Sequence, residues 1–149
     1  MIPLVRVFYI TLIASLLASL AAAMLADAFL GDRIAIIGSF AGLRYSLNPG
    51  IAFGLRLHPV LQPFLIAVAL GLVAWLAFKR GQSRLGQAAY GLILGGALGN
   101  VIDRLPDGLV TDYFQVGDFP IFNVADSCIT IGAAILLLES LKRPGSSSV

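Results

Sequence analysis

The stretch FNVADSCITIGAAILLL, residues 122–138, decides the fold of this chain. From Ser127 onward it is apolar enough to lie in lipid, yet Asp126 stands at its head, three residues after Asn123. An ionisable side chain at membrane depth is costly and is a functional candidate by default. The stretch therefore predicts a membrane-spanning helix and poses the question of what its carboxylate does.

The composition extends this prediction to the whole chain. Of its 149 residues, 58% are hydrophobic and 12% charged, and the mean hydropathy is +0.93. Soluble domains carry about 25% charged residues. The net charge of +2, without a basic cluster, gives no indication of nucleic-acid binding. The single cysteine, Cys128, excludes an internal disulfide and a cysteine-based zinc site, and we expect it to be an ordinary small buried side chain.

Runs of apolar sequence predict four membrane spans, at about residues 7–27, 60–78, 85–102 and 121–140. The first run resembles a secretory signal, but it is longer than the apolar core of about 7–15 residues that such signals have. We therefore expect it to be retained as the first span. The spans leave no room for a separate soluble module, so residues 1–149 should form a single integral membrane domain.

Basic residues in the short connections predict the orientation. Lys79, Arg80 and Arg84 lie between the second and third spans, and Lys142 and Arg143 follow the fourth. Positive residues favour the cytoplasmic side. Both termini should therefore be cytoplasmic, with the two longer connections on the outer, periplasmic side of a bacterial inner membrane.

Small residues recur every four positions in two of the spans, which predicts close helix packing. They are Gly91, Gly95 and Gly99 in the third span and Ala14, Ala18, Ala22 and Ala26 in the first.

Polar residues gather at the outer ends of the predicted spans and in the outer connections. Asn100, Asp103 and Arg104 stand at i, i+3 and i+4, so they share one helix face. Asn123 and Asp126 share another. The candidate site residues are Asp27, Asn48, Asn100, Asp103, Arg104, Asp112, Asn123 and Asp126.

Several of these residues also have a structural interpretation. Asn123 suits a helix N-cap, with Asp126 favoured by the helix dipole, and Asp103 and Arg104 suit an ion pair that closes the third span. Asp112 differs, because it lies in the β-prone hexamer LVTDYF with no cap or turn to explain it. Asp107, in LPDGLV, is by contrast a turn residue.

Asp112 and Asp126 suggest acid–base chemistry at the outer membrane face. If they lie close together in a poorly solvated site, both cannot ionise readily, and the pair would share a proton. Such a pair suits hydrolysis, because one carboxylate activates water while the other protonates a carbonyl oxygen. With His58 as the only histidine, neither a histidine-based zinc site nor a Ser–His arrangement is indicated. We expect no metal and no cofactor.

The outer segment 33–48 contains β-prone pieces on either side of Gly38 and Ser39, which predicts an extended hairpin at the membrane surface. Asn48 follows it in a turn with Pro49 and Gly50. Its amide would either bind substrate backbone or close this turn, and spacing alone does not decide between the two.

Three motifs in order carry a family resemblance: SLNPGIAFG at 46–54, GGALGNVIDRLPDGLVTDYF at 95–114 and FPIFNVADSCITIG at 119–132. Together they resemble the bacterial lipoprotein signal peptidases, the type II signal peptidases. The resemblance runs from about Asp27 to Ile131 and includes the four-span layout.

The resemblance implies four transmembrane helices with a small extramembrane β-structure on the periplasmic side. It implies an aspartic endopeptidase that removes the signal peptide of a prolipoprotein, cutting before a diacylglyceryl-modified cysteine. Asp112 and Asp126 match the catalytic pair. The positions that match supporting or substrate-binding residues are Asn48, Gly50, Asn100, Asp103, Arg104 and Asn123. We expect membrane lipid and the lipidated precursor as partners, no nucleic acid, and a functional monomer.

The chain departs from the family pattern at two positions. The family often has a lysine four residues after the aspartate that ends the first span, whereas Gly31 follows Asp27 here. Pro49 fills the middle of the family's Asn-x-Gly. The alternatives to a peptidase are a small channel or transporter with a polar outer mouth, for which the Asn-Pro-Gly turn would break a helix, and a purely structural membrane subunit.

Overall fold

The computed structural model describes residues 3–50, 61–80 and 83–142, so His58 and the end of the first family motif lie outside the described residues. Within these ranges the elements are α1 (Leu4–Phe29), β1 (Ile34–Ile37), β2 (Ala41–Asn48), α2 (Leu61–Arg80), α3 (Arg84–Asp103), β3 (Val110–Val116) and α4 (Val124–Lys142). Four of the described helices are long and apolar enough to cross a membrane. The predicted four-span fold with a small β-structure is confirmed.

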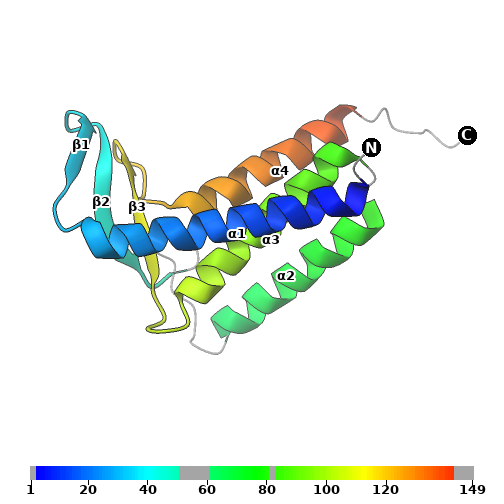
Figure 1. Ribbon diagram of the computed structural model, residues 1–149, viewed down its shortest axis with the longest axis horizontal. Helices are drawn as coiled ribbons and strands as arrows, with labels where there is room; N and C mark the ends of the chain where they lie inside the picture. The colour runs from blue at the N-terminus through cyan, green and yellow to red at the C-terminus, as the bar shows by residue number, and fades with distance from the viewer. Residues whose placement is uncertain (1–2, 51–60, 81–82, 143–149) are drawn as a thin grey trace, which may run out of the picture.

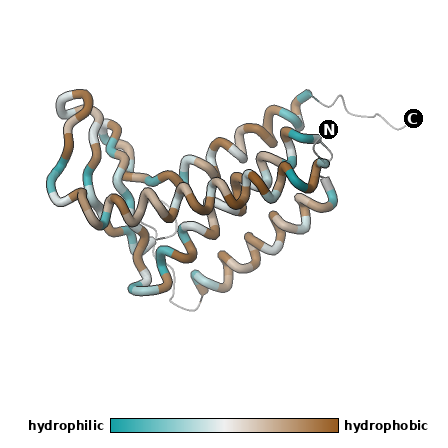
Figure 2. The backbone as a smooth tube through the Cα atoms, viewed as in Figure 1, coloured by the Kyte–Doolittle hydropathy of each residue, from teal (hydrophilic) through white to brown (hydrophobic). Residues whose placement is uncertain are grey.

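The helices form an elongated bundle, and the sheet lies across one end of it (Figure 1). Helix α1 begins and α4 ends at the opposite end. Helix α3 is central, because half of its apolar window is buried, compared with 6% for α2 and 11% for α4. The helices are largely hydrophobic along their length (Figure 2), and many large apolar side chains on them are exposed; Leu17 and Met24, for example, are 61% and 70% exposed. Such surfaces suit contact with lipid chains.

Helices α1 and α3 approach closely because the glycine ladder of α3 leaves room for backbone contact. A Cβ atom at Gly95 would come within 2.3 Å of the Leu12 carbonyl oxygen, and one at Gly91 within 2.6 Å of the Phe8 carbonyl oxygen. The predicted role of the third-span glycines in helix packing is confirmed. These glycines bring α3 against the backbone of α1.

The predicted alanine ladder of the first span is wrong at its first two positions, whereas Ala26 is buried. Ala14 and Ala18 are exposed, whereas Ser15 and Ser19, one position later, are buried against α3. Serine is as suitable as alanine here, because its hydroxyl bonds within its own helix and leaves no unpaired donor. Ser15 Oγ donates to the Leu12 carbonyl oxygen at 3.1 Å, and Ser19 Oγ donates to the Ser15 carbonyl oxygen at 2.7 Å.

The three described strands form an antiparallel sheet in the order β1-β2-β3. Gly38, with φ +49°, turns β1 into β2, as the hairpin prediction required. Between β2 and β3, Leu43 pairs with Phe114 and Ser46 pairs with Asp112. Three steps on β2 thus match two on β3, so β2 carries one extra residue, a bulge.

The sheet is fixed to the helices through two residues in the middle of β3, Tyr113 and Phe114. Tyr113 packs in a buried cluster with Ala26 and Leu30 at the end of α1. Phe122 forms an antiparallel bridge to Phe114 just before α4 begins. This bridge explains why α4 begins at Val124, later than the predicted 121. Cys128, on the first turns of α4, is half-buried rather than fully buried as predicted.

Candidate active site

Asp112 is almost fully enclosed. It lies in the middle of β3, and its side chain is 2% exposed. Its carboxylate accepts a hydrogen bond at each oxygen: from Asn48 Nδ2 at 2.9 Å and from Asn123 Nδ2 at 2.8 Å. One donor is on the neighbouring strand and the other at the head of α4, so the two amides fix the carboxylate from two directions.

Asp126 is held by the start of α4. Its backbone N–H donates to Asn123 Oδ1 at 2.9 Å, and its Oδ2 accepts the Asn123 backbone N–H at 3.4 Å. This reciprocal pair is a capping box, so the predicted N-cap role of Asn123 is confirmed. The other carboxylate oxygen, Asp126 Oδ1, accepts a hydrogen bond from Asn100 Nδ2 on α3 at 2.9 Å.

Asn123 joins the two carboxylates into one network. Besides Asp112, its Nδ2 contacts Asn100 Oδ1 at 3.0 Å. Asn100 in turn donates to Asp126. Strand β3, helix α3 and the head of α4 are thus connected through two asparagine amides and two aspartates. Sequence reasoning identified each residue and assigned Asn123 a cap and, through the resemblance, a supporting role, but nothing in the sequence indicates that its amide reaches Asp112.

The turn after β2 borders the network. Asn48 Oδ1 accepts the Gly50 N–H at 2.8 Å, so Asn48 closes the turn as well as donating to Asp112. Arg104 donates to the carbonyl oxygens of Gly50 and Asn100. It therefore ties the turn to α3. The Arg104 Nε is buried and has no hydrogen-bond partner among the described residues.

Two predicted residues, Asp27 and Asp103, lie behind β3 instead. Asp103 Oδ2 accepts the Thr111 N–H at 2.7 Å. Asp27 Oδ1 accepts the hydroxyls of Tyr45 at 2.8 Å and Thr111 at 3.2 Å. Hydroxyl groups thus satisfy Asp27, where the family resemblance leads one to expect a lysine at position 31. The contacts of Tyr45 and Thr111 have no signature in the sequence and were not predicted.

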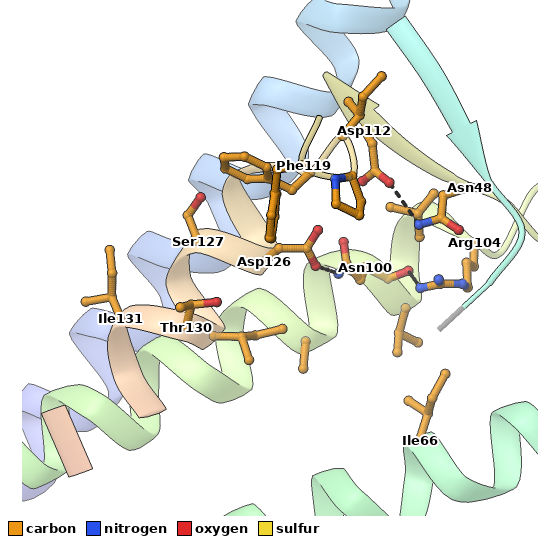
Figure 3. Close-up of a pocket in the computed structure, with 17 residues that line it drawn as sticks. Asn48, Ile66, Asn100, Arg104, Asp112, Phe119, Asp126, Ser127, Thr130 and Ile131 are labelled. Atoms are coloured by element: carbon orange, nitrogen blue, oxygen red, sulfur yellow. Dashed lines mark hydrogen bonds between the residues drawn. The ribbon is translucent and has the colours of Figure 1, made fainter. Parts of the chain in front are cut away.

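A cavity of about 700 Å³ lies between α2, α3, α4 and the segment that leads into α4. Asp112 and Asp126 both point into its polar end, beside Asn100 and Arg104 (Figure 3). Most of the remaining wall is apolar. The lining residues are Asn48, Ile66, Ala97, Asn100, Val101, Arg104, Val110, Asp112, Phe119, Pro120, Ile121, Phe122, Asp126, Ser127, Ile129, Thr130 and Ile131. Gly50, Asp103, Asn123 and Asp27 do not line it.

The pKa of Asp112 is raised from 3.8 to about 6, mainly by burial and in addition by the negative charge of Asp126. The amides of Asn48 and Asn123 act in the opposite direction, as does the positive charge of Arg104. Burial also lowers the pKa of Arg104, while the surrounding carboxylates favour its charged form. The two aspartates therefore interact electrostatically, as a proton-sharing pair requires.

Acid–base chemistry is what these groups can perform. A carboxyl group with a pKa near 6 can both give and take a proton close to neutral pH. Across the described ranges, no group of three or more His, Cys, Asp or Glu side chains is placed to hold a metal ion. The expected absence of a cofactor stays a prediction.

Comparisons with known proteins agree with the motif resemblance. A family model described as signal peptidase (SPase) II matches residues 7–142. A lipoprotein signal peptidase of Chlorobium luteolum is 42% identical, with 76% of this chain and 78% of the relative covered. A lipoprotein signal peptidase of Chlorobaculum tepidum is 41% identical, with 88% of this chain and 91% of the relative covered. A bacterial membrane enzyme solved by the in meso method at 1.9 Å resolution is 28% identical, with a TM-score of 0.82 and 92% and 94% of the two chains covered.

Proposed function

This chain belongs to the signal peptidase II family, and we propose that it removes the signal peptide of prolipoproteins as a membrane-embedded aspartic endopeptidase. Asp112 and Asp126 are the proposed catalytic pair. Because the chain belongs to this family, we no longer retain the channel, transporter and structural-subunit alternatives.

The observation that carries this proposal is the shared cavity of the two carboxylates. Asp112 and Asp126 come from different elements, a strand and a helix start, yet both point into the same polar pocket end. Each is oriented by asparagine amides. Carboxylates held rigidly in a poorly solvated pocket are suited to proton transfer, because little reorganisation is needed during the reaction.

In the proposed reaction a water molecule lies between the two carboxyl groups. Asp126 takes a proton from this water, whose oxygen attacks the scissile carbonyl carbon. Asp112, the carboxyl whose pKa burial raises, donates its proton to the carbonyl oxygen. The tetrahedral intermediate then collapses: the C–N bond breaks, Asp126 passes its proton to the leaving amine, and Asp112 recovers a proton from the intermediate's hydroxyl. Both aspartates end in their starting protonation states.

The cavity supports a lipidated substrate. Its apolar wall extends from the carboxylates along α4 to Ile131, and Ile66 of α2 forms the facing side. We propose that acyl chains of the diacylglyceryl group bind there. Each buried methylene would contribute about 0.8 kcal/mol. The cleavage site, next to the lipidated cysteine, then reaches the polar end of the same cavity.

The remaining predicted residues support this arrangement. Asn48, Asn100 and Asn123 orient the carboxylates, and Arg104 holds the Gly50 turn against α3. We propose that Asp103 and Asp27 act from behind β3. One chain carries both carboxylates, which is consistent with a functional monomer.

We further propose that the sheet end of the bundle faces the periplasm and that both termini are cytoplasmic. Lys79 and Arg84 flank the connection between α2 and α3, at the end of the bundle away from the sheet. This distribution follows the preference of positive residues for the cytoplasmic side. In a bacterial inner membrane, the catalytic pair would then meet precursors that have already been translocated.

The test is cleavage of a diacylglyceryl-modified prolipoprotein by the purified protein, with the unmodified precursor as comparison. We expect cleavage of the lipidated precursor alone. Asp112→Asn and Asp126→Asn should each abolish cleavage while the helical circular-dichroism spectrum is retained. Full processing by either variant would contradict the assignment of the catalytic pair.

A further inference from the structure

Asp27 connects helix α1 to two neighbouring strands through one oxygen atom. Its Oδ1 accepts the hydroxyl of Tyr45, on β2, at 2.8 Å and that of Thr111, on β3, at 3.2 Å. The end of α1 is thus hydrogen-bonded to both strands at the same point along the sheet. Burial and the bond to Asp27 raise the pKa of Tyr45 above its usual range, so its hydroxyl keeps its proton and remains a donor throughout the neutral pH range.

The bulge in β2 places Tyr45 in this position. Leu43 pairs with Phe114 and Ser46 with Asp112, so the extra residue of β2 falls between these pairs. Tyr45 lies in this interval and immediately precedes the pairing partner of Asp112. Bulges commonly redirect a side chain next to an active site. The extra residue therefore belongs to the local geometry that positions both Tyr45 and Asp112.

Thr111 and Asp112 face opposite sides of β3, because successive side chains of a strand alternate. Behind the strand, Thr111 is held by its hydroxyl to Asp27 and by its N–H to Asp103. In front, Asp112 points into the cavity. A slip of one residue would turn Asp112 away from the cavity. The contacts behind the strand thus determine which residue points forward.

We propose that Tyr45 is a positioning residue for Asp112. Its hydroxyl, acting through Asp27 and Thr111, holds β3 in the register that directs the Asp112 carboxylate between Asn48 and Asn123. Tyr45 itself contacts neither carboxylate of the catalytic pair. The inference rests on the proposed function, since positioning matters for catalysis only if Asp112 acts on the substrate.

The test compares Tyr45→Phe with the unchanged protein, using the lipidated precursor. This variant keeps the ring and removes only the donor. A small displacement of a catalytic group can cost about 10²-fold in rate, so we expect kcat to fall by about 10- to 100-fold while KM changes little. Tyr9→Phe is the matched control: the same atom is removed from a side chain that is 48% exposed on α1, and kcat should not change.

Substitutions at Asp27 separate the acceptor from its charge. Asp27→Asn retains an acceptor oxygen for the two hydroxyls and should keep most of the activity. Asp27→Ala removes the acceptor and should resemble Tyr45→Phe. Equal losses in Asp27→Asn and Asp27→Ala would overturn the proposal, because the charge rather than the hydrogen bonds would then matter.

The pH dependence of kcat provides a measurement that general destabilisation of the protein would not change. In Tyr45→Phe, Asp112 should lose the amide donors that hold its pKa down. Because Asp112 must be protonated to donate, the alkaline limb of kcat should then move to higher pH. Unchanged kcat per folded molecule with an unchanged profile would overturn the proposal. The charged and titratable groups around this region are Asp27, Asp103, Asp107 and Arg104 behind and beside β3, and Asp126 in front of it.

Hydrogen exchange distinguishes a failure of this inference from a failure of the proposed function. Amides of Val110–Val116 should exchange faster in Tyr45→Phe than in the unchanged protein, whether or not either cleaves the precursor. If the unchanged protein does not cleave, the proposed function fails, while faster exchange still supports the role of Tyr45. Unchanged exchange in the variant overturns the inference whatever the activity.

Discussion

The side-chain amide of Asn123 lies 2.8 Å from Asp112 Oδ1, with the nitrogen donating. The same residue caps α4 through its side-chain oxygen, which accepts the Asp126 N–H. One asparagine therefore sets the start of a helix and the position of a carboxylate on a separate strand. The two functions use different atoms, so substitutions can separate them.

Asn123→Asp should reduce activity more than stability. Aspartate is as good an N-cap as asparagine, but it has no amide to donate to Asp112 and adds a third carboxylate. We expect kcat to fall by about 10²-fold, with a melting temperature that approaches that of the unchanged protein only at acidic pH, where the added buried carboxyl group is neutral. Asn123→Ala loses the cap as well and should cost about 1 kcal/mol of stability. Normal cleavage by Asn123→Asp would contradict the bridging role.

The pH dependence of stability should differ between the unchanged protein and Asp112→Asn. Burial raises the pKa of Asp112 from 3.8 to about 6 in the folded state, so the folded protein binds this proton more tightly than the unfolded chain. The resulting stabilisation is fully present below about pH 4 and is lost as the pH rises through about 6. The free energy of unfolding should therefore be about 3 kcal/mol higher below about pH 4 than above about pH 6 through this group alone.

Thermal unfolding in detergent across this pH range measures the effect. The melting temperature of the unchanged protein, relative to that of Asp112→Asn, should decrease as the pH rises from about 4 to about 7. Two parallel curves would show that Asp112 does not titrate differently in the folded state.

Gly95→Ala should destabilise the bundle. A Cβ atom there would lie 2.3 Å from the Leu12 carbonyl oxygen and 2.0 Å from Ser15 Oγ, so α1 and α3 must move apart at a cost of about 2 kcal/mol. Gly71→Ala is the control, because a Cβ atom on that α2 residue meets nothing within 4 Å. It should stabilise the helix by up to about 1 kcal/mol. Unfolding measurements that rank the two variants in the opposite order would refute this account of the helix contact.

Ile66→Trp should weaken binding of the lipidated precursor. Ile66 lines the cavity from α2, and an indole would occupy part of the space proposed for the acyl chains. We expect KM to rise by about tenfold with little change in stability. Val68→Trp, on the same helix at a residue that is 52% exposed, is the matched control. If both variants bind the precursor normally, the acyl chains lie elsewhere.

The fold was largely predictable because its determinants are local. Span length, apolar composition and the Gly38 turn each act within a short segment, and the observed elements agree with them. The first two positions of the alanine ladder were misplaced by one residue because serine and alanine are equally small, and only the partner helix determines which of them faces it. The carboxylates of the candidate site could likewise be found as polar residues at one membrane face.

The contacts behind β3 could not be predicted from the sequence. Tyr45 reaches Asp27 from the bulged stretch of β2, and nothing in the letters LRYSLN marks where the extra residue falls. Thr111 is a common strand residue whose role depends on two carboxylates from distant segments. Long-range register, rather than residue type, determines these contacts.

The capping box at the head of α4 has a consequence for inhibitors of this enzyme. Consider a compound that binds beside the two carboxylates and contacts the side-chain amide of Asn123. The protein needs the nitrogen of this amide to orient Asp112, and the same residue starts helix α4. Escape substitutions at that position would therefore impair the enzyme itself. Resistance should arise instead in the apolar wall around Ile66 and Ile131, where side-chain shape can change without disturbing either role. Inhibitors that depend little on that wall should retain their potency longest.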